Sequence, residues 1–339
     1  MKVFIVGGTG LLGSEAAREL IKRGHEVTSI SLPPIPVGAN LPKEMKIEFG
    51  NYVDMSLEEL EKHLIGVDWV VFAAGVDERI EAPAPSYDFF KKYNIDGLEK
   101  IMKVAKRVGV KHVNICGSYF SHFAKKWPKE KLTKYHPYIR SRIDQETMAL
   151  SYADEKMSVS ILELPYIFGV QEGRKPVWVF LIEIIKAMKR NTYYPKGGTS
   201  MVSVKQVAEG IAGALENIKG GVSIPFGYYN MEWKEFLGIV HKYMGYPKKR
   251  RVITIPSFLL ALRGFKMRKE DKKKGIESGL NIVRFAKMMA TNLFIDPSEG
   301  ALSLGVKEDD IEKAIGDSVK LSLDIINKSS SNIIDMKGE

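Results

Sequence analysis

The most constraining feature of the chain is a glycine-rich turn that begins at its seventh residue. The apolar run at 3–6 predicts a buried strand and leads directly into Gly7-Gly8-Thr9-Gly10-Leu11-Leu12-Gly13. Apolar residues then recur every three to four positions over 12–23, which indicates a helix. In this order of elements, backbone N–H groups at a helix N-terminus can meet a phosphate that a Cβ would block. The context favours a dinucleotide-binding turn over a plain glycine turn.

The first half of the chain alternates short apolar runs with helical patterns. Expected strands at 25–32, 69–74, 113–116 and 158–162 are separated by expected helices. This alternation predicts βαβ units and a parallel sheet covered by helices on both faces. The second half is less regular. We therefore expect an α/β fold, a Rossmann-type doubly wound parallel sheet with a smaller mixed α/β substrate domain.

The same pattern suggests how the chain divides. Residues 1–165, joined by a returning segment at about 201–218, are expected to form the NAD(P)-binding Rossmann domain. Residues 166–200 and 219–325 are expected to form the substrate-binding domain. The polar residues 326–339 are expected to form a flexible tail.

Composition excludes several classes of protein. The 339 residues include one cysteine and six scattered histidines, which argues against a disulfide framework, and we predict no metal site. No run of 18 apolar residues exists, and the apolar run at the start is too short for a signal peptide. We therefore expect a cytoplasmic protein.

The residues that close the second strand bear on the choice of cofactor. An acidic residue there would bind the ribose hydroxyls of NAD, and an arginine would favour NADP. The sequence at this point is Ile30-Ser31-Leu32-Pro33. It offers neither group, and Ser31 could accept either cofactor, so NAD and NADP both stay open.

With these residues in view, the chain resembles the extended short-chain dehydrogenase/reductases, the NAD-dependent epimerase/dehydratase family. Gly7, Gly10 and Gly13 match the spaced glycines of that family. Further short segments match in order over about 1–325, namely 50–54, 66–75, 93–97, 164–169, 201–208, 228–230 and 236–245. The resemblance implies a cofactor site formed by Gly7, Gly10, Leu11, Leu12, Gly13, Ser31, Asn51, Tyr52, Ala73, Ala74, Gly75, Pro165 and Ile167.

The resemblance also implies a catalytic group of Ser118, Tyr138 and a cation four residues after the tyrosine. A tyrosine has an ordinary pKa near 10, so it is a weak base at neutral pH. A cation one helical turn away lies on the same face and stabilises the phenolate. The expected roles are acid/base for Tyr138, carbonyl polarisation for Ser118, electrostatic support for Arg142, and organisation of a proton-relay water for Asn94.

The chain departs from the family in two ways that matter. Arg142 stands where the family has lysine, which keeps the charge but changes the geometry. Thr199 and Ser200 stand where nucleotide-sugar enzymes carry an Arg-Asp pair, so a nucleotide-sugar substrate is not predicted. Our first hypothesis is an NAD(P)-dependent oxidoreductase or epimerase/dehydratase-like enzyme that acts by hydride transfer on a small hydroxyl or keto substrate, either neutral or anionic. The alternative is a catalytically weak or inactive dinucleotide-binding protein with a regulatory or RNA/anion-binding role.

The formal net charge of +10 is unevenly distributed. Residues 101–150 hold 11 basic and 3 acidic side chains, and residues 248–274 hold 11 and 2. Nucleic acid, a membrane surface or a subunit interface would account for the second cluster. A core helix at 256–264 with solvated flanks is the interpretation we favour over these three. The helical segments 86–108 and 138–156 resemble the dimer-forming pair of the family, so we expect a homodimer.

Overall fold

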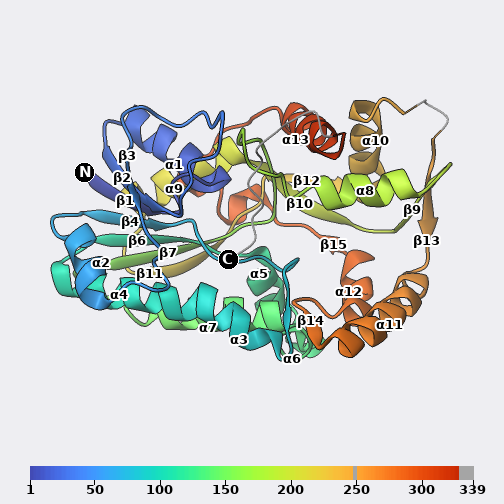
Figure 1. Cartoon of the computed structure of the whole chain (residues 1–339), viewed down its shortest axis with the longest axis horizontal. Helices are drawn as coiled ribbons and strands as arrows, with labels where there is room; N and C mark the ends of the chain where they lie inside the picture. The colour runs from blue at the N-terminus through green and yellow to red at the C-terminus, as the bar shows by residue number, and fades with distance from the viewer. Residues whose placement is uncertain (247–249, 328–339) are drawn as a thin grey trace.

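A seven-stranded parallel sheet forms the centre of the larger lobe in the computed structural model, which describes residues 1–246 and 250–327 (Figure 1). The strand order is β11-β7-β6-β4-β1-β2-β3. The bounds are β1 Lys2–Val6, β2 Glu26–Ser31, β3 Lys46–Phe49, β4 Trp69–Phe72, β6 His112–Cys116, β7 Ser158–Glu163 and β11 Gly221–Pro225. All six pairings are parallel. The prediction of a doubly wound Rossmann-type sheet is confirmed.

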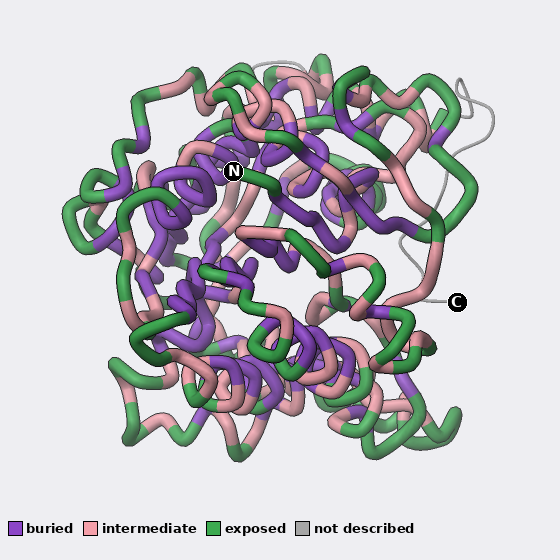
Figure 2. Tube along the Cα trace, turned by 90° about the vertical axis from the view of Figure 1, so that its left-hand side faces the viewer, coloured by how far each residue is buried: buried purple, intermediate pink, exposed green. Residues whose placement is uncertain are grey.

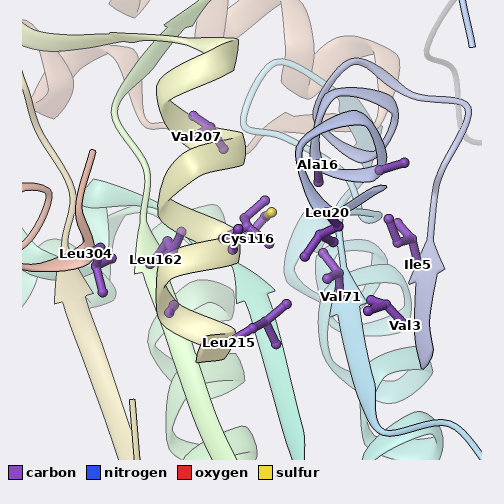
Figure 3. Close-up of a cluster of buried hydrophobic side chains, with 14 of the residues drawn as sticks. Val3, Ile5, Ala16, Leu20, Val71, Cys116, Leu162, Val207, Leu215 and Leu304 are labelled. Carbon is purple, nitrogen blue, oxygen red and sulfur yellow. The ribbon is translucent and has the colours of Figure 1, made fainter. Parts of the chain in front are cut away.

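Helices cover both faces of this sheet because each presents one apolar face to it. On one face, α1 (Leu11–Lys22) lies over β1 and β2, and α9 (Val204–Asn217) packs beside it over β6 and β7. Figure 3 shows Ala16 and Leu20 from α1 and Val207 from α9 pointing into this core. The other face is covered by α2 (Leu57–Leu64), α4 (Gly97–Val108) and α7 (Pro137–Leu150).

The smaller lobe has its own sheet and core. Its strands are β8 (Tyr166–Phe168), β10 (Gly198–Ser203), β12 (Tyr229–Glu232) and β15 (Asn292–Leu293), with β10 pairing to the other three. Three helices pack there around buried aromatic side chains: α8 Val179–Ala187, α10 Trp233–Tyr243 and α13 Ile311–Ile326. Figure 2, viewed from the end that holds the large sheet, shows buried chain in the interior of the molecule and exposed chain on its outer turns.

The remaining elements are short, except for one helix. Two strand pairs, β5 with β14 and β9 with β13, stand apart from the main sheets. The bounds are β5 Glu81–Pro83, β9 Thr192–Pro195, β13 Val252–Ile255, β14 Ile276–Ser278, α3 Ser86–Lys91, a π-helical turn Lys92–Asp96, α5 Tyr119–Lys126, α6 Leu132–Tyr135, α11 Ser257–Lys274, α12 Ile282–Met289, and 3₁₀ turns Pro128–Glu130, Pro297–Glu299 and Leu302–Leu304.

The structure corrects the expected boundary between the two domains. Residues 219–225, assigned to the substrate domain, include β11, which is an edge strand of the large sheet. Residues 201–203, assigned to the Rossmann domain, belong to β10 of the small sheet. The chain therefore enters the large lobe between β10 and α9, and it returns to the small lobe between β11 and β12. Most of the expected tail, 328–339, lies outside the described residues.

The expected core helix at 256–264 is wrong in both length and burial. Helix α11 runs on to Lys274, and Gly264 is its one buried residue. Charged residues fill its second half, and they are strong helix formers that continue the helix past the apolar segment. The basic segment therefore lies on the surface and not in the core.

Candidate active site

The glycine turn folds tightly between β1 and α1. Gly7 has a φ of +93°, which L-residues with a side chain rarely adopt, and the N–H of Gly10 donates to the oxygen of Gly7 at 3.0 Å. A Cβ on Gly13 would lie 2.3 Å from that same oxygen. Ser31 lies beneath the turn, where its hydroxyl oxygen accepts a hydrogen bond from the N–H of Thr9 at 3.1 Å. Ser31 is thus buried under the loop, outside the lining of the cleft.

An arginine from the other lobe holds the same turn from above. Arg174 donates from Nε to the main-chain oxygen of Thr9 and from Nη2 to its hydroxyl, each at 2.9 Å. Partial burial lowers the pKa of Arg174. A few residues earlier in the chain, the Gln171 side chain accepts from the hydroxyl of Ser14, in α1, at 3.0 Å. The loop after β8 therefore fixes the glycine turn and sets a cation next to it.

A cleft of about 290 Å³ opens between the lobes at the carboxyl ends of β1, β4 and β6. Eight of the predicted cofactor residues line it: Gly10, Leu11, Leu12, Ala73, Ala74, Gly75, Pro165 and Ile167. The N–H groups of Leu11, Leu12 and Gly13, at the start of α1, donate no hydrogen bond to any residue that the structure describes. Free donors at a helix N-terminus form an anion site, so the cleft suits the pyrophosphate of a dinucleotide.

Tyr138 and Arg142 lie together on the wall of this cleft. Both are on α7, one helical turn apart, and Arg142 Nε donates to the phenol oxygen of Tyr138 at 3.0 Å. Burial raises the pKa of Tyr138, while the charge of Arg142 and hydrogen bonds from Ser118 and Arg142 act to lower it. The arrangement predicted from the four-residue spacing is therefore present.

Ser118 lies where β6 ends, next to Tyr138 in the lining of the cleft. It is the N-cap of α5, and its hydroxyl accepts weakly from the N–H of Phe120 at 3.4 Å. The hydroxyl is also near enough to hydrogen bond with Tyr138 and help lower the pKa of that phenol. Capping and contact with the phenol are compatible, because a hydroxyl can both accept and donate.

Asn94 is buried in the π-helical turn and does not line the cleft. Its side-chain amide accepts from Val76 N–H at 2.8 Å and donates to Val76 O at 3.1 Å. Its main-chain oxygen accepts from Gln145 Nε2 at 2.5 Å, and Gln145 Oε1 accepts from Arg142 Nη1 at 2.9 Å. A chain of side chains thus links Tyr138 through Arg142 and Gln145 to the Asn94 backbone. Sequence reasoning missed Gln145, although it lies three residues after Arg142 on the same helix face.

Two other predicted cofactor residues lie outside the lining of the cleft. Asn51 bonds within its own turn, donating to Asp54 at 2.6 Å. The Tyr52 hydroxyl donates to Tyr93 O at 2.9 Å, and its ring packs edge-on against Phe72. Both residues support the floor beside β4.

The substrate side of the cleft contains groups that sequence reasoning did not single out. The loop 77–79 after β4 contributes Asp77, Glu78 and Arg79. Burial raises the pKa of Glu78, whereas Arg79 holds the pKa of Asp77 below its ordinary value. Aromatic side chains also line the cleft, namely Tyr119, Tyr166, Trp178 and Phe180, and the Arg79 guanidinium lies over the Phe180 ring. Periodicity could not reveal this aromatic lining, because aromatic residues in short strands and helices read equally well as core.

Thr199 and Ser200, which stand in place of the Arg-Asp pair of the family, are buried outside the lining of the cleft. Thr199 Oγ1 lies 3.0 Å from the hydroxyl of Tyr119, and the Ser200 hydroxyl accepts from Ile295 N–H at 2.7 Å. Both are fully buried. Within residues 1–246 and 250–327, no group of three His, Cys, Asp or Glu side chains could hold a metal ion. No helix in those ranges is long and apolar enough to cross a membrane.

Comparison with known proteins agrees with this geometry. Over 175 residues the chain is 26% identical to a UDP-glucose 4-epimerase of Lactobacillus helveticus, which is 49% of this chain and about half (51%) of that protein. A UDP-glucose 4-epimerase from Bifidobacterium longum, solved with NAD⁺ and UDP, superposes with a TM-score of 0.67 at 17% identity, covering 98% of this chain and 100% of that one.

The Bordetella bronchiseptica enzyme WbmH, solved with NAD⁺, gives a TM-score of 0.65 at 16% identity, covering 94% and 97% of the two chains. At these identities the structures establish the fold alone. The model of the NAD dependent epimerase/dehydratase family matches residues 3–226, about two thirds of the chain. The chain belongs to the NAD dependent epimerase/dehydratase family.

Proposed function

We propose that the protein is an NAD-dependent enzyme that interconverts a hydroxyl and a keto group on a small substrate, with the chemistry of an epimerase. The observation that carries this proposal is the buried phenol of Tyr138, held at 3.0 Å by Arg142 beside Ser118 and the glycine turn. A phenol, a second hydroxyl and a cation around one cleft are suited to moving a proton at a substrate oxygen.

The cofactor site fits a dinucleotide through its backbone. Leu11, Leu12 and Gly13 would donate their free N–H groups to the pyrophosphate, and Arg174 adds a positive charge next to Thr9. Bound there, NAD would supply the hydride acceptor and donor. We propose NAD over NADP because the family is described as NAD dependent and the related structures were solved with NAD⁺; Ser31-Leu32-Pro33 at the end of β2 carries neither an acid for the ribose nor an arginine for a 2′-phosphate.

The three cleft residues divide the proton chemistry. Arg142 keeps its proton at any working pH, so it acts as a fixed charge and hydrogen-bond donor. Its hydrogen bond occupies one lone pair of the Tyr138 oxygen and leaves the phenol proton for the substrate. Ser118 would hold the same substrate oxygen. Asn94 would act through the backbone and Gln145 to hold Arg142 in place.

The cleft also limits the kind of substrate. The diphosphate pair of nucleotide-sugar enzymes is replaced by buried Thr199 and Ser200, so such a group would need other partners. Arg174 lines the cleft and would suit an anionic group of the substrate, whereas Arg79 is already paired with Asp77. The aromatic side chains of the cleft and the carboxyl of Glu78 suit a hydroxylated ring, which could stack on the former and hydrogen bond to the latter. The homodimer expected through 86–108 and 138–156, and the cytoplasmic location, stay predictions.

A second function rests on how completely Arg142 is engaged. Its guanidinium bonds Tyr138 and Gln145 at once, and Arg142 is buried with both. A lysine at this position would have a flexible side chain that could reach the cofactor ribose, whereas the Arg142 guanidinium is held by Tyr138 and Gln145. The alternative is therefore a dinucleotide-binding protein with little turnover.

Substituting Tyr138 by phenylalanine separates the two functions. NAD binding is measured by titration calorimetry, and turnover by NADH absorbance and product analysis with a panel of hydroxylated substrates, UDP-glucose included. We expect the variant to bind NAD normally and to lose on the order of 10²–10⁴-fold in turnover. Turnover that survives the substitution would contradict the assigned role. NAD binding with no turnover by the native protein on any substrate would favour the alternative.

A further inference from the structure

Helix α11 carries a group of large apolar side chains that are exposed on the surface of the protein. Phe258, Leu262 and Phe265 follow one another at helical spacing and are 60%, 60% and 57% exposed, and the neighbouring Leu259 is 43% exposed. Figure 1 shows α11 at the outer edge of the molecule, with α12 on its inner side. Grouped exposed apolar residues of this size mark an interaction surface.

The same helix carries a strong positive charge. Ser257–Lys274 contains seven Lys and Arg and two acidic residues, and the cations are concentrated in the second half. Lys266, Lys269 and Lys273 continue along the outer face that Phe258 and Leu262 begin. The N-terminal half of α11 is therefore mainly apolar, and its C-terminal half is mainly basic.

A basic groove of about 950 Å³ opens beside α11, between it, α12 and the segment 126–136. Five cations line it, Lys126, Lys129, Arg268, Arg284 and Lys287, against one acid, Glu130. Phe265 belongs to both the groove and the exposed stripe. Lys287 pairs with Glu130 at 2.6 Å, and Arg284 lies over the ring of Tyr135. Lys126, Lys129 and Arg268 have no ion-pair partner among the described residues.

His136 supplies a second, independent sign that the groove takes a ligand. The side chain lines the groove yet is fully buried, and its Nδ1 accepts from Asn281 N–H at 3.0 Å. The proton must therefore sit on Nε2, which has no partner within the described chain. A buried donor without a partner is costly, and because Nε2 is closed off from solvent, an acceptor oxygen in the groove would satisfy it once the lining moves aside.

We propose that the α11 surface and the basic groove together bind an anionic membrane surface, with a lipid phosphate in the groove. The exposed stripe from Phe258 to Phe265 would enter the boundary between headgroups and acyl chains, and the lysines of α11 would meet the anionic headgroups. Nucleic acid would explain the cations but leave Leu259 and Leu262 exposed. A second copy would bring two helices of the same charge together.

Vesicle sedimentation of the full chain tests the proposal. We expect binding to vesicles of phosphatidylglycerol with phosphatidylcholine, weakening as salt is raised, and little binding to phosphatidylcholine alone. Equal binding to both vesicle types, or binding to neither, would overturn the proposal. So would retention of RNA without retention of anionic vesicles.

Matched substitutions locate the surface. Leu262→Glu and Lys269→Glu should each weaken vesicle binding by about tenfold or more. Ile65→Glu and Lys43→Glu change equally exposed residues elsewhere and should leave it unchanged. All four positions are exposed, and unchanged melting temperatures and NAD affinities would show intact folding. If Ile65→Glu and Lys43→Glu weakened vesicle binding as much as Leu262→Glu and Lys269→Glu do, α11 would not be the membrane-binding surface. If the native chain self-associated and Leu262→Glu abolished that association, α11 would be an interface between copies and the proposal would also fail.

The groove is tested with Arg268→Ala and with a soluble phosphate. Arg268→Ala should lower affinity for anionic vesicles several-fold, and glycerol 3-phosphate should compete with the vesicles. If glycerol 3-phosphate binds the groove while vesicles do not bind at all, the site serves a free phosphate compound and the membrane proposal fails.

Discussion

Arg174 donates two hydrogen bonds of 2.9 Å to Thr9, one to its main-chain oxygen and one to its hydroxyl. The two residues are 165 positions apart and come from different lobes. The contact closes the loop after β8 over the glycine turn, and it places a guanidinium beside the free N–H groups of α1. The mouth of the cleft is therefore formed by both lobes.

Removing the two hydrogen bonds from Arg174 to Thr9 should weaken cofactor binding. We expect Arg174→Ala to raise the dissociation constant for NAD by roughly tenfold or more, because a charge-assisted hydrogen bond contributes about 1.5–3 kcal/mol. Arg174→Lys should recover only part of the affinity, since an ammonium cannot form both bonds in one plane. Titration calorimetry measures both values. Arg107→Ala, which removes a surface arginine paired with Glu61 far from the cleft, is the control and should bind NAD as the native chain does.

Arg142 should set the pH at which the enzyme works. Its charge and its hydrogen bond lower the pKa of Tyr138, which burial alone would raise further. In Arg142→Met the pKa of Tyr138 should rise, so the ascending limb of the pH–rate profile should move to higher pH. We expect turnover at neutral pH to fall about 10²-fold. Arg142→Lys keeps the charge and should shift the profile less. An unmoved ascending limb in Arg142→Met would show that the phenol does not titrate in the reaction.

Local patterns predicted the part of the fold that is built from neighbours in sequence. The strand at 3–6, the turn at Gly7 and the helix after it were all visible, since each depends on residues within a few positions. The π-helical turn at Lys92–Asp96 was not visible, because the bonds of Asn94 to Val76 fix it from a distant loop. An apolar run in a sequence does not show whether other elements pack against it, so the sequence predicts core for the first half of α11, which the structure exposes.

The site divided in the same way. Spacing alone placed Tyr138 and Arg142 on one helix face, and the structure has them there. Arg174, Glu78 and the aromatic lining come from loops whose approach to the cleft depends on how the two lobes pack. Ser31 was expected at the ribose, but its hydroxyl is bonded to Thr9 beneath the turn. A side chain at a motif position can therefore stabilise the local fold by a hydrogen bond and not contact the ligand.

Stability should fall as the pH rises from about 4.5 to 7, because of Glu163. This carboxyl is buried next to Glu146, and burial together with that neighbouring charge raises the pKa of Glu163 to about 7. The folded state then holds a proton that the unfolded state has released, so the unfolded state gains as the pH rises through that window. We expect Glu163→Gln to remove this slope in urea unfolding measured from pH 5 to 8, and to be at least as stable as the native chain at pH 8.

Glu146→Gln provides the matched comparison. Without the Glu146 charge the pKa of Glu163 should fall, so the decline in stability should shift to lower pH and become smaller. Lys125, which contacts both carboxylates at 2.9 Å and 2.8 Å, remains paired with one of them in either variant. A slope between pH 5 and 7 that neither substitution changes would show that other groups cause it.

Two glycine substitutions should have opposite effects on the fold. A Cβ on Gly13 would lie 2.3 Å from the oxygen of Gly7 and 2.9 Å from the Cα of Gly8, and both of these are backbone atoms that cannot rotate away. Gly13→Ala should therefore cost about 1–3 kcal/mol and displace the turn that meets the cofactor. Gly238 is exposed inside α10 and has nothing within 4 Å of its added Cβ. Gly238→Ala should stabilise the chain by about 0.5–1 kcal/mol and leave NAD binding unchanged. Urea unfolding and NAD titration of the two variants compare them directly. If Gly13→Ala bound NAD as tightly as Gly238→Ala does, the close approach of α1 to the turn would not be needed for the cofactor site.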